Sequence, residues 1–207
     1  MKILFFELMG ALTGSGDDKG CFMDEINMHE GLDYKIKEGI PTIGNMPTQK
    51  VVSINVVGDP NTETSKLMKP LYTAAYGVRK IYKANGSVFK VDKLRGRWPQ
   101  INMTKNKSDW IGTYALPLPN DVAKLPDSDQ DINNLRLEEW EYGKVAYILH
   151  VGSYTNEDKT IKILLDYITS NGMKIIKNSH EEIYLSDPTK TDKDKLKTII
   201  LYRIDPV

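Results

Sequence analysis

Cysteine and histidine are scarce in this sequence, and each scarcity excludes a class of site. Cys21 is the single cysteine among 207 residues, so no disulfide can form within the chain, and we expect a reducing, cytoplasmic location. The 3 histidines, His29, His150 and His180, are too scattered for a zinc-ligand pattern. Phosphate-binding and dinucleotide-binding glycine motifs are missing as well. We therefore expect neither a metal nor a cofactor.

The sequence also lacks an excess of charge of either sign. It has 28 basic and 28 acidic residues and no basic stripe with interleaved aromatic residues, so no direct contact with nucleic acid is expected. Long hydrophobic runs are missing too, because Glu7 interrupts the apolar opening MKILFFELMGAL, which is too short to span a bilayer. Hydrophobic residues make up 40% of the chain, which is typical of a globular protein without membrane segments.

The sequence does contain an order of elements that occurs twice. The first occurrence is predicted as a strand over 49–60, a helix over 65–86, and strands over 87–98 and 109–118. The second is predicted as strands within 136–152, a helix over 153–172, and strands over 181–187 and 198–204. The stretch between them, 119–134, holds 2 prolines and many turn-forming residues, which indicates a linker.

This repetition predicts an α+β fold made of two pseudo-symmetric strand–helix–strand–strand modules. The modules span residues 48–118 and 135–207. We expect antiparallel sheets with helices on one face and a ligand cleft on the other face. Residues 1–47 show no clear period and are predicted to form a loop-rich N-terminal extension.

The strand EEIYL near the C-terminus alternates in a way that separates two faces. Ile183 and Leu185 point to one side, which we expect to be the core, while Glu182 and Tyr184 point to the other. A carboxylate among aromatic rings could balance a cationic ligand or act as a general acid or base. The plainer alternative is a solvated glutamate, because lone carboxylates are usually exposed.

Several aromatic residues are candidates for the walls of the same site. Trp110 and Tyr114 share a strand face, with space between them at a glycine, and Trp98 ends the preceding strand. Tyr72 and Tyr76 are four residues apart and therefore share a helix surface. Such rings suit a flat, apolar or cationic small molecule. The alternatives are that the tyrosines form a core edge and that the two tryptophans pack on each other across a hairpin.

Three stretches carry a resemblance to a known family. ILHVGSYTNE, the following helix ending in SNG, and HEEIYLSDPTKTDKDKLKTIILYRI resemble the C-terminal half of the gyrase-inhibitor-like (GyrI-like) small-molecule-binding family. INVVGDPN, LYTAAYGVRK and the spaced Trp98 and Trp110 resemble the first half of its free-standing members. The resemblance covers about residues 48–207. Two departures are the single Trp98 within RGRWPQ, where relatives often carry paired tryptophans, and Pro70 in the first helix.

The resemblance implies a ligand cleft between the two modules, with an acidic residue of the EEIYL strand facing the ligand. That residue is Glu182 here, and Trp98, Trp110 and Tyr114 match the aromatic cleft positions. Together with Tyr72, Tyr76 and Tyr184 they complete the predicted ligand-binding set: Glu182, Trp98, Trp110, Tyr114, Tyr72, Tyr76 and Tyr184. The relatives include effector domains of drug-sensing transcription regulators, gyrase-modulating proteins, and hydrolases of cyclopropane-bearing DNA alkylators.

Three functions follow as hypotheses. The leading one is a stand-alone module of the multidrug-sensing type that binds a hydrophobic or cationic small molecule, since no helix-turn-helix segment is evident. The second is hydrolysis of a strained electrophilic ring, in which Glu182 activates water and Tyr184 or Tyr114 protonates the leaving group. The third is a protein-partner role such as binding DNA gyrase.

Overall fold

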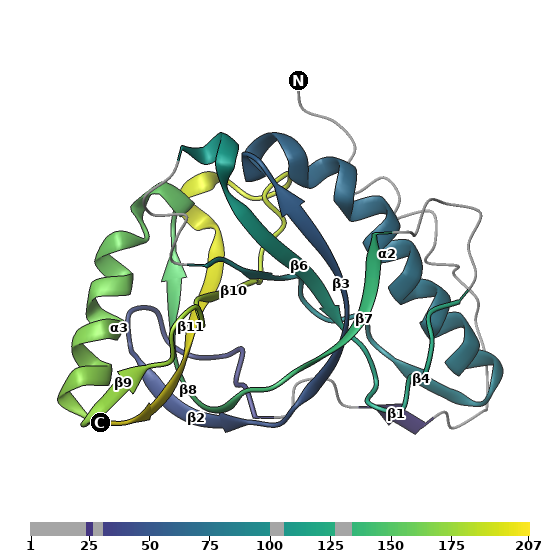
Figure 1. Cartoon of the computed structure of the whole chain (residues 1–207), viewed down its shortest axis with the longest axis horizontal. Helices are drawn as coiled ribbons and strands as arrows, with labels where there is room; N and C mark the ends of the chain where they lie inside the picture. The colour runs from purple at the N-terminus through teal and green to yellow at the C-terminus, as the bar shows by residue number, and fades with distance from the viewer. Residues whose placement is uncertain (1–23, 27–30, 100–105, 127–133) are drawn as a thin grey trace.

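A computed structural model describes residues 24–26, 31–99, 106–126 and 134–207 (Figure 1). Its first half contains β1 (Asp24–Ile26), β2 (Thr42–Met46), β3 (Gln49–Val57), α2 (Pro60–Ala84), β4 (Ser87–Phe89), β5 (Arg95–Arg97), the 3₁₀ helix η2 (Lys107–Asp109) and β6 (Ile111–Pro117). Its second half contains β7 (Leu135–Trp140), β8 (Gly143–Val151), η3 (Tyr154–Asn156), α3 (Asp158–Ser170), β9 (Met173–Ile175), β10 (Glu181–Tyr184), η4 (Lys193–Lys195) and β11 (Lys197–Pro206). Much of the predicted extension 1–47 and of the predicted linker 119–134 lies outside the described residues.

The main sheet is built symmetrically about the pairing of β10 with β5. Its strands follow the order β2-β8-β11-β10-β5-β6-β3-β7, and the pairings along this path are antiparallel. The predicted α+β class is therefore confirmed. The predicted strand over 87–98 is two short strands instead, because β4 pairs with β1 in a separate two-stranded sheet and β5 pairs within the main one.

The outer strands are exchanged between the two halves. β2 precedes β3 in the chain but pairs with β8, and β7 precedes β8 but pairs with β3. Strand β2 lies before residue 48, where we predicted the first module to begin, so part of the predicted extension belongs to the main sheet.

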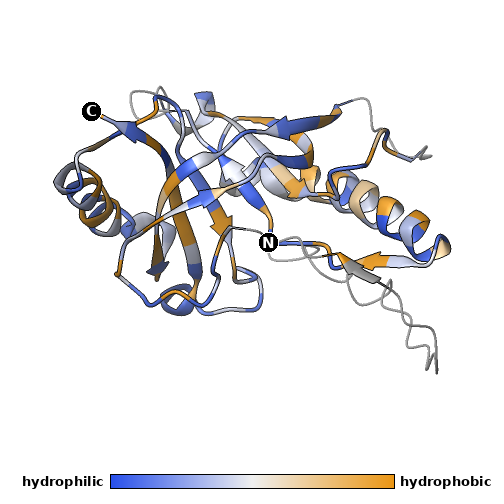
Figure 2. Cartoon of the chain, turned by 90° about the horizontal axis from the view of Figure 1, so that it is seen from below, coloured by the Kyte–Doolittle hydropathy of each residue, from blue (hydrophilic) through white to orange (hydrophobic). Residues whose placement is uncertain are grey.

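Both described α-helices cover the same face of the sheet. The apolar face of α2 packs against β3 and β6 through Leu71, Ala75 and Val78. Leu164 and Ile168 of α3 pack against β8 and β11. The sheet is strongly curved, with α2 and α3 outside the curve (Figure 1), and both helices carry hydrophobic and hydrophilic residues around their circumference (Figure 2). Among the described residues, neither helix combines the length and the apolar character needed to cross a membrane.

The position of the candidate side chains corrects one part of the predicted architecture. Glu182 lies opposite Ile200, which packs under α3, and Gly96 lies opposite Tyr114, which packs under α2. Directly opposite residues on antiparallel strands point to the same face. The candidate residues are therefore on the helix-covered face, between the helices, and not on the opposite face as we predicted. That opposite face is occupied by a core that includes Ile183.

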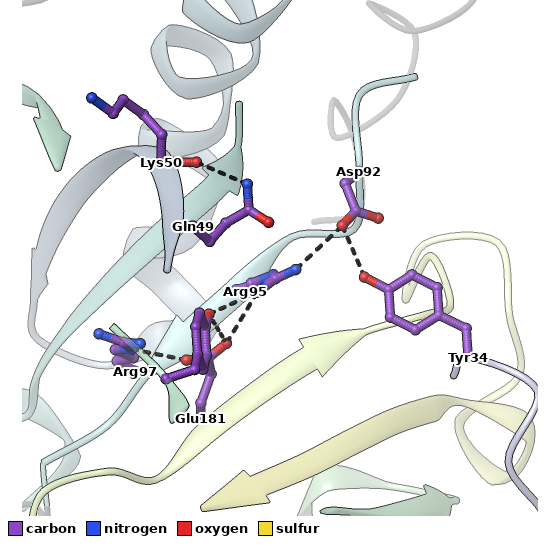
Figure 3. Close-up of polar contacts among 8 residues, drawn as sticks. Tyr34, Gln49, Lys50, Asp92, Arg95, Arg97 and Glu181 are labelled. Carbon is purple, nitrogen blue, oxygen red and sulfur yellow. Dashed lines mark hydrogen bonds and ion pairs between the residues drawn. The ribbon is translucent and has the colours of Figure 1, made fainter. Parts of the chain in front are cut away.

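The core on the opposite face encloses a network of charged groups (Figure 3). Glu181 accepts a hydrogen bond from Arg97 at 2.8 Å and lies 3.8 Å from Arg95. The Tyr142 hydroxyl accepts from Arg95 at 2.7 Å and donates to Glu181 at 2.8 Å. Asp92 pairs with Arg95 at 3.4 Å. Two positive and two negative charges thus balance across the β5–β10 pairing, with Glu181 and Arg95 each only 1% exposed.

Removing one member of this network should be costly. In Glu181→Ala the two arginines lose their shared carboxylate in a buried place, so we expect the free energy of unfolding to fall by about 3–5 kcal/mol. Urea denaturation measures the loss. The control is Asp166→Ala, which breaks the exposed Lys162–Asp166 pair at 2.9 Å and should cost about 0.5 kcal/mol or less. Equal losses in the two variants would contradict this role for Glu181.

Candidate functional site

The candidate site lies at the centre of the sheet, where β10 meets β5. Glu182 of β10 lies directly opposite Gly96 of β5, so the carboxylate stands at the point about which the strand order is symmetric. Tyr184 is two residues further along β10, and Trp98 directly follows the end of β5. The indole Nε1 of Trp98 donates to the Tyr184 hydroxyl at 3.2 Å. The structure therefore brings three of the predicted residues, one carboxylate and two rings, into one place.

The Glu182 carboxylate is held by two polar neighbours. His180 Nε2 lies 3.1 Å from Oε1, and the Tyr184 hydroxyl donates to Oε2 at 2.8 Å. His180 in turn contacts the Tyr202 hydroxyl through Nδ1 at 2.8 Å. The Glu182 side chain is 14% exposed, so the plainer alternative of a freely solvated glutamate does not describe it. Its orientation is fixed while solvent still reaches it.

Glycines make room for the rings around this carboxylate. A Cβ at Gly96 would lie 2.8 Å from the Tyr184 hydroxyl and 3.0 Å from Trp98 Nε1. A Cβ at Gly112 would lie 2.5 Å from Cζ3 of Trp98. The space that we predicted beside Trp110 and Tyr114 thus exists and is occupied by the Trp98 ring.

Five rings form a continuous series over this part of the sheet, which we call the aromatic series: Trp110, Trp98, Tyr114, Tyr184 and Tyr154. The ring centroids are 6.3 Å apart for Trp110 and Trp98, 5.4 Å for Trp98 and Tyr114, 6.4 Å for Tyr114 and Tyr184, and 5.9 Å for Tyr184 and Tyr154. Tyr114, in the middle of the series, is 4% exposed, whereas Trp110 at one end is partly accessible and Tyr154 at the other end is 37% exposed. The two tryptophans do pack on each other, as one alternative had it, and they remain part of this series.

Tyr72 and Tyr76 form a stacked pair on α2, with centroids 6.4 Å apart. Tyr72 packs against the same core as Trp98 and Tyr184, and burial raises its pKa. That the pair also faces a ligand stays a prediction.

The hydroxyls inside the site are weak acids. Burial, with the Glu182 charge as a second cause, raises the pKa of Tyr184 well above its ordinary value. Burial raises the pKa of Tyr114 to about 12, and the Tyr114 hydroxyl lies 2.8 Å from that of Thr64 on α2. Both phenols are therefore neutral hydrogen-bonding groups at neutral pH.

Glu157 is a second carboxyl group near Glu182 that no sequence pattern indicated. It is 7% exposed, and burial together with the charges of Glu182 and Asp158 raises its pKa to about 9. The raised pKa favours the protonated form of Glu157 at neutral pH. Like-charged neighbours and burial both act against a second negative charge here.

Tyr154 and His180 were also missed. His180 could have been found, because the alternation that puts Glu182 and Tyr184 on one face places His180 there as well. Tyr154 and Glu157 lie in and after η3, where the sequence offers no periodic signal. His150 holds this segment, with Nδ1 at 2.9 Å from the Thr160 hydroxyl and Nε2 at 3.2 Å from the Ser153 carbonyl.

A comparison with models of protein families identifies the family of this chain. The model of the GyrI-like small-molecule-binding domain matches residues 41–205. The chain belongs to this family. A GyrI-like domain binds small molecules, so binding of a small molecule is the coarse function that family membership supports. A comparison with curated proteins gave no match.

Solved structures share the fold of this GyrI-like domain. A hydrolase from Listeria innocua has a TM-score of 0.72 at 23% identity, with 83% of this chain and 95% of that chain covered. The C-terminal domain of EcmrR has a TM-score of 0.57 at 12% identity, with 81% of this chain and 98% of that chain covered. At these identities the likeness establishes the fold. Within the described residues no group of three His, Cys, Asp or Glu side chains is placed to hold a metal ion.

The glycine that accommodates Trp98 generates a testable prediction. Gly112→Ala puts a methyl group where the Trp98 ring lies, so the ring must shift, and we expect a loss of about 1–3 kcal/mol in stability. Tryptophan emission should change at the same time. The control is Gly44→Ala in β2, whose Cβ would meet Tyr147 at 3.5 Å, an ordinary contact. An unchanged emission spectrum in Gly112→Ala would contradict the placement of Trp98.

The raised pKa of Glu157 predicts a dependence of stability on pH. Between the ordinary glutamate value and about 9, the folded chain binds a proton at Glu157 that the unfolded chain releases. Stability conferred by this proton is therefore lost as pH rises, by at most about 1.4 kcal/mol per pH unit. Glu157→Gln should thus gain stability relative to the wild type between pH 5 and pH 8, measured by urea denaturation. A difference independent of pH would show that Glu157 is ionised in the folded chain.

Proposed function

We propose that this chain binds a flat hydrophobic cation, with Glu182 supplying the negative charge and the aromatic series supplying the contact surface. A contrast between neighbouring carboxylates supports this proposal most directly. Glu181 is neutralised by Arg95 and Arg97, whereas among the residues that the structure describes Glu182 forms an ion pair with His180 alone. A histidine is charged only when protonated. Glu182 thus offers a negative charge that a ligand cation can neutralise.

The rings favour the same ligand class. The faces of tryptophan and tyrosine rings attract cations, and the attraction grows when water is excluded. Trp98, Trp110 and Tyr154 are partly accessible, so a ligand that approaches Glu182 can meet ring surface on its way. We propose that Tyr72 and Tyr76 extend this surface along α2. The ligand would then bind in the manner of a multidrug-sensing effector domain.

The charge requirement can be isolated with two probes of nearly the same shape. N-methylphenanthridinium carries a permanent positive charge, and phenanthridine is neutral at pH 7.5. In Glu182→Gln we expect affinity for the cation to fall about tenfold or more, since a charged contact contributes about 1.5–3 kcal/mol. Affinity for phenanthridine should stay within about twofold. Quenching of tryptophan fluorescence measures both.

The matched control is Glu139→Gln, which removes a negative charge from an exposed side chain of β7 that pairs with Lys50. It should leave both affinities unchanged. Equal losses for the cation in the two variants would mean that overall charge, and not Glu182, attracts the ligand.

A second candidate function is hydrolysis of a cyclopropane-bearing alkylator, favoured by the 2.8 Å contact between Glu182 and the Tyr184 hydroxyl. Glu182 would take a proton from water while the water oxygen bonds to a ring carbon. The carbon–carbon bond of the ring breaks, and its electron pair moves into the conjugated part of the substrate, which then takes a proton from Tyr184 or Tyr114. A gyrase partner stays a prediction from the family resemblance.

Turnover separates these two candidates. If the chain is a hydrolase, Glu182→Gln should lower the rate about 100-fold or more while binding of the intact alkylator survives. Liquid chromatography of the ring-opened product measures the rate. Stoichiometric binding without product over many hours would leave the binding function as the only candidate of the two.

A further inference from the structure

Glu157 occupies a position where a carboxylate usually has a ready partner. It is the N-cap residue of α3, next to backbone N–H groups that carry partial positive charge. The Glu157 side chain nevertheless forms no capping hydrogen bond. Its carbonyl accepts from the Ile161 amide at 2.8 Å, so the helix begins regularly while the carboxyl group turns elsewhere.

The carboxyl group is buried without a partner for one of its oxygens. Glu157 is 7% exposed, and its Oε1 is a buried atom that has no hydrogen-bond partner among the described residues. A buried polar atom without a partner costs about 1–3 kcal/mol. Such an atom is expected where a bound molecule completes the site.

The titratable groups around Glu157 come from four elements. They are Tyr154 of η3, Asp158 of α3, Glu182 of β10 and Tyr202 of β11. Burial is the first cause of the raised pKa values of Tyr154 and Tyr202, and both Glu182 and Glu157 add to it. The two carboxyl groups therefore both influence the hydroxyls of Tyr154 and Tyr202. Among the described residues, His180 is a basic side chain in contact with this set, through the Glu182 carboxylate and the Tyr202 hydroxyl.

We propose that Glu157 is a second carboxyl group of the ligand site and that a bound lipophilic cation takes the place of its proton. The inference rests on the proposed cation-binding function. On binding, the O–H bond of the Glu157 carboxyl breaks, the proton passes to solvent, and the carboxylate left behind pairs with the ligand cation. One positive charge leaves as another enters, so the charge of the site is the same with and without ligand.

This exchange gives the site a way to discriminate between ligands. In the empty site the proton keeps two neighbouring carboxylates from being ionised together. A neutral ligand of the same shape offers no charge to replace the proton, so it leaves Glu157 protonated. The preference for a cation over its neutral analogue should therefore widen as pH rises toward the range in which Glu157 ionises.

Isothermal titration calorimetry tests the exchange directly. With N-methylphenanthridinium at pH 7.5, in two buffers of different ionisation enthalpy, the wild type should release about 0.5 to 1 proton per cation bound. Phenanthridine should release none. The dissociation constant for the cation should fall by up to about tenfold per pH unit between pH 6.5 and 8.5.

Two variants test whether Glu157 is the source of the released proton. Glu157→Gln imitates the protonated carboxyl, so it should fold, bind the cation with an affinity independent of pH, and release no proton. His180→Gln removes the imidazole that contacts Glu182, and this variant should still release the proton. Continued release in Glu157→Gln, or its loss in His180→Gln, would overturn the role of Glu157.

The outcomes also separate this inference from the function on which it rests. If the wild type binds neither probe, the proposed function fails. If the cation binds tightly without release of a proton and with an affinity independent of pH, the function stands and the exchange at Glu157 is wrong.

Discussion

The ion pairs of Glu181 with Arg95 and Arg97 fix the strand pairing on which the site depends. They join β10 to β5 on the concave side of the sheet, where Glu181 and Arg95 are buried and Arg97 is partly exposed. Since successive side chains of a strand point to opposite faces, a buried position for Glu181 forces Glu182 onto the helix side. A slip of one residue would turn Glu181 to the helix side and Ile183 out of its core, so the placement of both glutamates depends on this register. The burial of Glu181 and the accessibility of Glu182 therefore both result from the register of β10 with β5.

The alternation within β10 was predictable from the sequence, and the face on which it places Glu182 was not. Period-two alternation correctly separates Glu182 and Tyr184 from Ile183, because it depends only on local backbone geometry. Whether a helix covers that face depends on pairings between distant segments, such as Gly96 with Tyr114. Duplicated element order, helix stripes and the α+β class follow from local patterns. The exchange of β2 and β7 depends on contacts far apart in the chain and leaves no local signal.

The sequence predicted only part of the candidate site, because local patterns reveal some of its residues and not others. Trp98, Tyr114 and Tyr184 are strand residues or lie at a strand end, so their spacing carries information about direction. Glu157 lies at the junction of a 3₁₀ helix and α3, where neither period applies, and its environment is made by residues from three other elements. The raised pKa of Glu157 results from contacts that exist only in the folded chain, so the sequence alone could not indicate it.

The exchanged outer strands make the two halves of the molecule dependent on each other. Without the N-terminal part of the chain, β8 would lose β2 and present a bare row of amide and carbonyl groups along one side; β3 would do the same without β7. Bare strand edges recruit strands from other molecules. A fragment that holds either half alone would thus be expected to self-associate, and two intact chains that opened together could trade these strands and close again as an interlocked dimer.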